Sequence, residues 1–227
     1  MVIRTGLARK PWTNYKTSNH IIAYLDILGV KDMICNDNNF DFLNHLNMFM
    51  EDAIEESGGG IFPKEEDIYI KIFSDNILLA IESKENDENK EQKIQKLFNT
   101  VANIYNEILR YGYLMRGAIV EGEFFHNDII EYGKGLVDAV QLEGNIAKYP
   151  RIIVKTKVNE ANSWYYLMKD SDEEVFLNIF RLCEGVDGAT FKINLLGLLK
   201  KYKNNKKIKE KIMWMINYFN SWFTKYE

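Results

Sequence analysis

The chain has 227 residues, 46% of them hydrophobic, and a formal net charge of −4. This length can bury one sizeable core, no Gly/Ser/Pro-rich linker divides the chain, and the charge gives no overall attraction to nucleic acid. No apolar run reaches the roughly 20 residues of a membrane span, and the N-terminus lacks the apolar core of a signal peptide. We therefore expect one cytoplasmic domain over residues 1–227 that binds neither membrane nor nucleic acid.

The first half of the chain predicts a strand, a helix and a hairpin. The run "HIIAYLDILG", residues 20–29, is almost uniformly apolar and ends in glycine, which is typical of a buried central strand. The segment "NFDFLNHLNMFMEDAIEES" has helical spacing and ends at three glycines. The runs "DIYIKIFS" and "NILLAIES" predict two strands, with Asp75 at or near the turn between them.

The second half continues the alternation. The segment "EQKIQKLFNTVANIYNEILRYG" has the clearest helical pattern in the chain. The runs "YLMRGAIVEGEFF" and "DIIEY" predict a strand pair, and "GKGLVDAVQLEGNIAKY" predicts a helix that stops before a proline. Three residues of this last helix are expected to face inward: Leu136, Val140 and Ala147.

A short strand, "RIIVK", follows, and beyond about residue 160 the pattern weakens. The element order predicts an α+β fold of the ferredoxin-like or palm type, with a mostly antiparallel sheet flanked by helices. The core of this fold is expected to span about residues 20–196. The basic run 200–211 is expected to be the solvated start of an amphipathic C-terminal helix over about 205–226.

Cysteine and histidine side chains are not expected to carry chemistry. Cys35 and Cys183 have no metal-ligand spacing, so both are predicted to be small buried hydrophobes. The three histidines are scattered along the chain, which disfavours a histidine-built zinc site.

Two aspartates interrupt the predicted strands. Asp26 lies in the first strand, where an unpaired carboxylate would be costly to bury, and Asp75 interrupts the hairpin. If these strands are neighbours, both carboxylates emerge at one edge, where Mg²⁺ or Mn²⁺ and nucleotide phosphates would satisfy them. Gly29 would let the chain turn so that backbone N–H groups face a polyphosphate. The alternative is that Asp26 pairs with a buried Lys or Arg and that Asp75 only caps a turn.

These segments carry a resemblance. "YLDILGV" and "KIFSDNILLAI" resemble the two metal-binding motifs of class III nucleotidyl cyclases. "YLMRGAIVEGEFF", "EYGKGLVDAVQLEGNIAKYPRIIV" and "DGATFKINLL" together resemble the bacterial Pycsar-type pyrimidine cyclases of antiphage defence. The similarity runs in order from about residue 21 to residue 196.

The resemblance implies the class III cyclase catalytic fold and a reaction. Two divalent ions, Mn²⁺ or Mg²⁺, would be held by Asp26, Asp75 and the backbone carbonyl of Ile27. The ribose 3′-hydroxyl of UTP or CTP would attack the α-phosphate, giving a 3′,5′-cyclic pyrimidine mononucleotide and pyrophosphate. The family implies a homodimer with composite active sites and a downstream effector that responds to the cyclic nucleotide.

The chain also departs from the purine-specific members of this family. Aligned on Gly133, their transition-state Asn and Arg correspond to Val137 and Gln141, neither of which is charged. Positive charge would then come from Arg116 or Arg151. For Arg151 an equally good interpretation is a salt bridge with Glu143.

Base recognition in the purine enzymes uses a Lys four residues before the second metal aspartate. Lys71 stands there, and it would either bond a base carbonyl or simply face outward from its strand. The partner acidic position aligns with Ile130, which disfavours the purine pattern and modestly supports a pyrimidine. Two rival functions remain open: a cyclase-like nucleotide-binding or sensor protein without turnover, and a palm-type nucleotidyltransferase.

Overall fold

The structure is a computed structural model, and it describes residues 15–30, 34–35, 40–56, 68–84, 88–156, 165–182 and 188–223. For 49–56 and 223 only the backbone is described. The described strands are β1 (Ser18–Leu28), β2 (Tyr69–Phe73), β3 (Asn76–Glu82), β4 (Leu114–His126), β5 (Glu131–Tyr132), β6 (Ile152–Val154), β7 (Leu167–Lys169) and β8 (Val175–Leu177). The described helices are α2 (Asp41–Glu56), α3 (Lys90–Arg110), α4 (Lys134–Asn145), α6 (Ile179–Leu182), α7 (Gly188–Lys201) and α8 (Lys206–Phe223).

The strands form one sheet in the order β2-β3-β1-β4-β6-β8-β7, and β5 pairs with β4 off this path. Neighbouring strands are antiparallel except for the β4–β6 pair, which is parallel. The prediction of an α+β fold with a mostly antiparallel sheet flanked by helices is confirmed. β1 lies at the centre of the sheet between β3 and β4, as its apolar sequence predicts.

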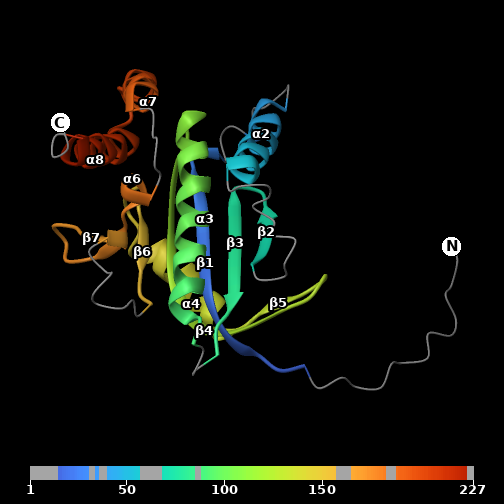
Figure 1. Cartoon of the computed structure of the whole chain (residues 1–227). Helices are drawn as coiled ribbons and strands as arrows, with labels where there is room; N and C mark the ends of the chain where they lie inside the picture. The colour runs from blue at the N-terminus through green and yellow to red at the C-terminus, as the bar shows by residue number, and fades with distance from the viewer. Residues whose placement is uncertain are drawn as a thin grey trace, which may run out of the picture.

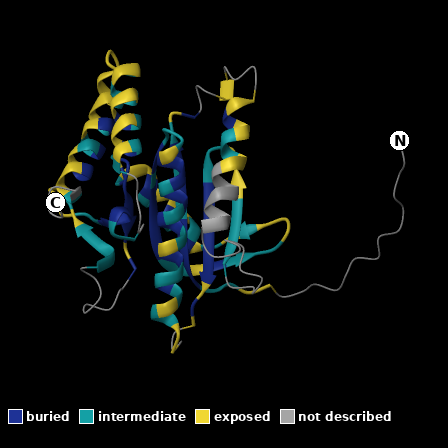
Figure 2. Ribbon diagram, turned by 45° about the horizontal axis from the view of Figure 1, so that its top comes forward, coloured by how far each residue is buried: buried dark blue, intermediate teal, exposed yellow. Residues whose placement is uncertain are grey.

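Helices cover both faces of the sheet, with α3 on one side and α4 on the other (Figure 1). Alternate residues of β1 point to opposite faces. Ile21, Ala23, Leu25 and Ile27 enter the large core under α3, whereas Ile22 joins a smaller core under α4. Figure 2 shows the central strands as the most buried part of the molecule, and α7 and α8 as largely exposed on their outer sides.

The packing of α4 on the sheet depends on a contact between two glycines. A Cβ atom added to Gly122 of β4 would lie 2.9 Å from the Cα of Gly135 in α4, so the two backbones touch. Just before α4, Gly133 has a φ of 151°, and a Cβ there would lie 2.2 Å from the backbone oxygen of Glu123. Only glycine can therefore bring this helix so close to the strand.

Most elements that the sequence predicts are present, with three corrections. Val140 is 40% exposed and does not face inward, because α4 turns Ala139 and Glu143 toward the sheet instead. Cys35 is exposed, not buried, and Cys183 lies outside the described residues. Between about residue 160 and the C-terminal helix, where the sequence pattern weakens, the structure contains β7, β8, α6 and α7.

The C-terminal helix is confirmed over Lys206–Phe223. Its residues Ile212, Met215, Tyr218 and Phe219 are buried in the large core, so α8 packs onto the domain. No helix among the described residues combines the length and apolar character that crossing a bilayer requires.

The glycine contact gives a stability prediction. Gly135→Ala should lower the free energy of unfolding by roughly 1–3 kcal/mol, because its methyl group would overpack against Ile22 and the Gly122 backbone. Gly144→Ala is the matched control in the same helix: no atom lies within 4 Å of its added Cβ, and better helix propensity should stabilise by up to about 1 kcal/mol. Urea unfolding of both variants measures the difference. Equal effects of the two substitutions would contradict the proposed backbone contact.

Candidate active site

The candidate site lies where β1 reaches the end of the sheet. Asp26 is opposite Asn76 of β3 on one side and opposite Arg116 of β4 on the other. Strand alternation places Asp26 on the same face as Ile22 and Tyr24, the face that α4 covers. The Asp26 side chain is 18% exposed, so it is shielded from water but still accessible from the edge.

The β2–β3 hairpin brings Asp75 to the same edge. Ser74 and Asp75 are the two loop residues, and Ser74 has a φ of 60°, a left-handed conformation that is uncommon for a residue with a side chain. The N–H of Ile27 donates to the backbone oxygen of Asp75 at 2.9 Å. Because the N–H and C=O of one strand residue point to the same side, the Ile27 carbonyl also faces the hairpin.

The two aspartates are close enough to interact electrostatically. The pKa of Asp26 is raised above its ordinary value, mainly because the carboxyl is buried. The hydrogen bond and the positive charge of Arg116 lower this pKa, and the negative charge of Asp75 raises it. Asp75 also accepts a hydrogen bond from the side-chain amide of Asn76 at 3.1 Å. The hairpin therefore adds a second negative charge beside Asp26.

Arg116 lies between Asp26 and a second carboxylate, Glu143 of α4. Its Nε donates to Asp26 Oδ2 at 3.0 Å and lies 2.7 Å from Glu143 Oε1. This nitrogen carries one hydrogen, which is aligned with Asp26, and Glu143 Oε1 has no aligned donor among the described residues. A second guanidinium nitrogen donates to the backbone oxygen of Ala147 at 3.3 Å. Two carboxylates thus share one cation.

Lys211 of α8 extends the cluster. Burial lowers its pKa, the charge of Arg116 lowers it further, and the charges of Asp26 and Glu143 oppose this shift. Burial likewise raises the pKa of Glu143, against the charge of Arg116. Lys211 is half-buried, so the expectation of a solvated basic run does not hold at its last residue. The sequence carries no signal for this electrostatic interaction, because it is between the C-terminal helix and the first strand.

The contacts of Asp26 match the alternative interpretation, in which it pairs with an arginine, and Asp75 does lie in a turn. Metal binding by Asp26, Asp75 and Ile27 stays a prediction, and no group of three or more His, Cys, Asp or Glu side chains suited to a metal ion occurs in the described part of the chain. Mg²⁺ commonly takes one or two protein carboxylates together with substrate phosphates, so this pair of aspartates and a carbonyl suits such an ion.

Arg151 lies in a different environment from Arg116. Its side chain is fully buried and bonds to Asp170 and to Asp172, with a distance of 2.9 Å from Nη1 to Asp172 Oδ1. Asp170 also accepts a hydrogen bond from the indole of Trp214 at 2.8 Å. The predicted salt bridge between Arg151 and Glu143 is wrong, because Glu143 pairs with Arg116. A catalytic role for Arg151 stays a prediction.

Lys71 pairs with a carboxylate that the sequence alignment missed. Its Nζ lies 2.7 Å from Glu131 Oε1, and the same oxygen accepts a hydrogen bond from the Tyr69 hydroxyl at 2.6 Å. The acidic partner therefore stands one residue after Ile130, which is 50% exposed. The lack of an acid at Ile130 does not distinguish a purine site from a pyrimidine site, so it no longer supports a pyrimidine.

Other predicted residues lie around this edge or on the surface. Gly29 follows β1 with a φ of 83°, which confirms that the chain turns there. Its contact with a polyphosphate stays a prediction. Val137 is 53% exposed, and Gln141 is also exposed on α4. Neither position supplies a charge to the cluster around Asp26.

Comparisons with known proteins give only distant likenesses. No family model matches the chain, and no curated protein matches it. The chain is similar to the guanylate cyclase domain of RhGC from Catenaria anguillulae, solved in complex with GTP, with 14% identity over 71% of this chain and 95% of that chain and a TM-score of 0.48.

Two further solved structures are similar at the same level. One is a bacterial light-regulated adenylyl cyclase, with 13% identity, 87% of this chain and 58% of that chain covered, and a TM-score of 0.48. The other is a class III adenylyl cyclase-like ATP-binding protein from Pseudomonas aeruginosa, with 8% identity, 79% and 40% coverage, and a TM-score of 0.46. All three likenesses are too distant to assign a reaction to this chain, so its own residues must indicate the chemistry.

The shared cation gives a second stability prediction. Arg116→Met should destabilise the fold by roughly 2–4 kcal/mol, because Asp26 and Glu143 lose their counter-charge in a partly buried site. Adding Glu143→Gln to that variant should recover part of the loss, since one uncompensated carboxylate is removed. Urea unfolding of the two single variants and the double variant measures the coupling.

Lys155→Met is the matched control, because it breaks the more exposed ion pair with Glu174 and should cost less than about 1 kcal/mol. Strictly additive effects of Arg116→Met and Glu143→Gln would contradict the shared-cation arrangement.

Proposed function

We propose that this protein is a metal-dependent nucleotide cyclase that converts UTP or CTP to a 3′,5′-cyclic pyrimidine mononucleotide and pyrophosphate. The observation that carries the proposal is the joining of β1 to the hairpin: Ile27 N–H bonds to the Asp75 carbonyl, and the negative charge of Asp75 acts on Asp26. A pair of carboxylates at an accessible sheet edge is the kind of ligand set that a divalent ion takes together with substrate phosphates. The choice of a pyrimidine is supported by the family resemblance alone.

Each substrate group and metal ion would have its own partners in the chain. Asp26, Asp75 and the Ile27 carbonyl would bind two Mn²⁺ or Mg²⁺ ions. When bound, the ions would favour ionisation of the ribose 3′-hydroxyl and offset the charge of the departing pyrophosphate. The turn at Gly29 would offer backbone N–H groups to the phosphates. Lys71 would donate to a carbonyl of the base, next to Glu131.

Arg116 would serve two functions at this site. Before metal binds, it neutralises Asp26. Afterwards, its guanidinium can remain on Glu143, which is already 2.7 Å away, so Asp26 is freed without leaving Arg116 unpaired. Of the two arginines considered as sources of positive charge for the transition state, Arg116 is the one whose contacts favour the role. Arg151 is held by Asp170 and Asp172.

A homodimer would complete the site. Large apolar side chains are exposed on the outer side of α4 and on the hairpin around β5: Ile129, Ile130, Tyr132, Val137 and Val140. We take these five exposed residues as the apolar patch of a candidate interface, because large exposed apolar side chains favour association. A two-fold interface would use this patch on both copies, and it would bring a second chain next to Lys71 and Glu131.

The biological setting is an expectation from the resemblance. A cyclic pyrimidine nucleotide made in the cytoplasm would act as a second messenger on a cyclic-nucleotide-responsive effector in antiphage defence.

A second candidate function is nucleotide binding without turnover. The observation that favours it is the ion pair of Arg116 with Asp26, together with the uncharged residues at Val137 and Gln141. Calorimetry would then show tight binding of a nucleoside triphosphate with no release of pyrophosphate. A palm-type nucleotidyltransferase is distinguished by mass spectrometry, because its products are oligonucleotides.

Turnover gives the direct test. Incubation with each of the four nucleoside triphosphates and Mn²⁺ should yield a monomeric cyclic nucleotide from UTP or CTP, detected by mass spectrometry. Asp26→Asn and Asp75→Asn should each reduce the rate by about 1000-fold or more, because each removes a charged metal ligand. Glu88→Gln, at an exposed acidic position in the turn before α3, should leave the rate unchanged.

Absence of any cyclic product from the wild-type protein would reject the cyclase. Equal product from the wild type and Asp75→Asn would reject the assigned metal site. A cyclic purine product would keep the cyclase and overturn the choice of base.

The interface gives a separate prediction. Val140→Asp should shift the protein from dimer to monomer in sedimentation velocity, because a charge would be buried in the apolar patch. Ile193→Asp is the matched control, since Ile193 is 70% exposed on α7, away from this patch. A wild-type protein that sediments as a monomer would contradict the dimer.

A further inference from the structure

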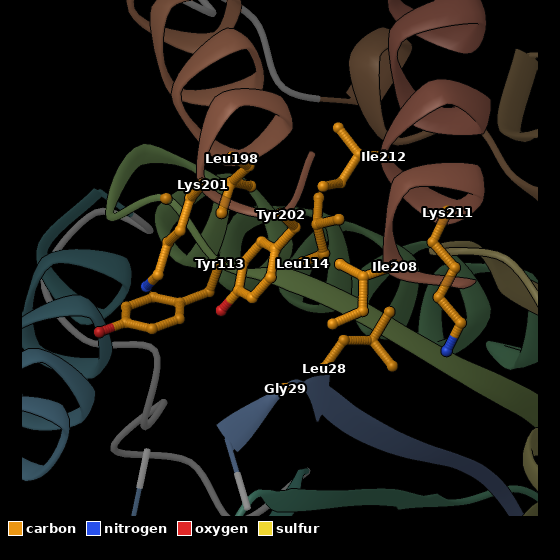
Figure 3. Close-up of a pocket in the computed structure, with 11 residues that line it drawn as sticks. Leu28, Gly29, Tyr113, Leu114, Leu198, Lys201, Tyr202, Ile208, Lys211 and Ile212 are labelled. Atoms are coloured by element: carbon orange, nitrogen blue, oxygen red, sulfur yellow. The ribbon is translucent and has the colours of Figure 1, made fainter. Parts of the chain in front are cut away.

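A small apolar cavity lies between the C-terminal helices and the end of β1 (Figure 3). Its volume is about 100 Å³. Eleven described residues line it: Leu28, Gly29, Gly112, Tyr113, Leu114, Leu198, Lys201, Tyr202, Ile208, Lys211 and Ile212. They come from the end of β1, the start of β4, α7 and α8, so the cavity exists only where the two C-terminal helices meet the sheet.

We propose that this cavity binds a short-chain carboxylate of about six heavy atoms, with its carboxylate on Lys201 and its apolar chain among the leucines and isoleucines. The cavity borders the edge that holds Asp26 and Asp75, because Gly29 and Lys211 are among its lining residues. The proposal does not depend on turnover.

The size of the cavity limits the ligand. A cavity of about 150 Å³ lined by apolar side chains holds one benzene molecule. A cavity of 100 Å³ therefore suits a molecule somewhat smaller than benzene, such as a chain of three or four carbons with a small head group. Nucleotides and long-chain fatty acids are too large to be enclosed here.

The lining determines the chemistry of the ligand. Five lining residues are leucine or isoleucine, so an inorganic anion alone would leave most of the apolar lining without an apolar contact. Two lining residues are lysines and none of those described is acidic, which favours a negatively charged head group. A small amphipathic anion satisfies both conditions.

Lys201 is the cation available to this ligand. Figure 3 shows Lys201 beside Tyr113 at one end of the cavity and Lys211 at the opposite end. Lys201 is exposed on α7, its ammonium lies 5.3 Å from the centre of the Tyr202 ring, and no ion pair of Lys201 with a described carboxylate is found. The ammonium of Lys211 already interacts with Asp26 and Glu143. The head group should therefore lie at the Lys201 end.

Occupancy of this cavity would affect the candidate active site indirectly. The ligand's chain would pack against Leu28, two residues after Asp26, and against the stem of Lys211. It would thereby hold α7 and α8 against the end of β1. We expect the ligand to raise the melting temperature even without a nucleotide, because it binds only the folded arrangement.

The experiment is a saturation-transfer NMR titration of the full chain with butyrate and, in parallel, with 1-butanol. Butyrate should bind saturably and more tightly than 1-butanol. Lys201→Gln should weaken butyrate binding about tenfold, a change of about 1.4 kcal/mol, and leave 1-butanol unaffected. Lys200→Gln, the exposed neighbour that does not line the cavity, is the matched control and should leave both ligands unaffected.

A second variant tests the location without altering charge. Leu198→Trp should fill the cavity and abolish binding of both probes, with circular dichroism to confirm that the variant is folded. Any of three results would overturn the proposal: no saturable binding of butyrate to the wild type, equal affinity for 1-butanol, or unchanged butyrate affinity in Lys201→Gln. None of these results depends on whether the protein turns over a nucleotide.

Discussion

The charge balance at the end of β1 is the constraint on which the candidate site depends. Asp26 and Glu143 approach each other from a strand and a helix, and one guanidinium stands between them. Two carboxylates in so sheltered a place would repel each other and lose their hydration without a cation. Arg116 provides that cation, and Lys211 adds a second positive charge from the far end of the chain. The same balance suits a metal ion, because a divalent ion could replace the arginine on Asp26 while Glu143 retains it.

The close approach of α4 is what makes this balance necessary. Gly122 and Gly135 let the helix lie with its backbone against β4, which carries Glu143 down to the level of Arg116. If a side chain at position 122 or 135 held α4 farther from β4, Glu143 would stay at the surface. The glycine contact between α4 and β4 thus determines which charged groups meet farther along the same helix–sheet interface.

The sequence predicted the elements well wherever periodicity is strong. The buried strand β1, the hairpin with Asp75 in its turn and the long helix α3 all follow from local patterns. The expectation that Asp26 and Asp75 lie at the same edge depended on β1 and the hairpin being neighbours, and β1 does pair with β3. The side chains that contact the predicted site residues could not be predicted from local patterns. Val140 was placed inward because α4 has apolar residues on more than one side, and its rotation is set by the glycine contact. Glu131 and Lys211 were missed because their contacts depend on the register of a two-residue strand and on how α8 docks. Long-range geometry of this kind leaves no pattern in a single sequence.

The hairpin turn has a mechanical consequence. Ser74 adopts a backbone conformation that favours glycine and that costs a residue with a side chain about 1–3 kcal/mol. Pairing of β2 with β3, and the bond from Ile27 to the Asp75 carbonyl, must hold the loop against its tendency to relax. The same backbone bond links the two ligand-bearing segments, so a ligand that displaced the Asp75 backbone would also act on the end of β1 through Ile27.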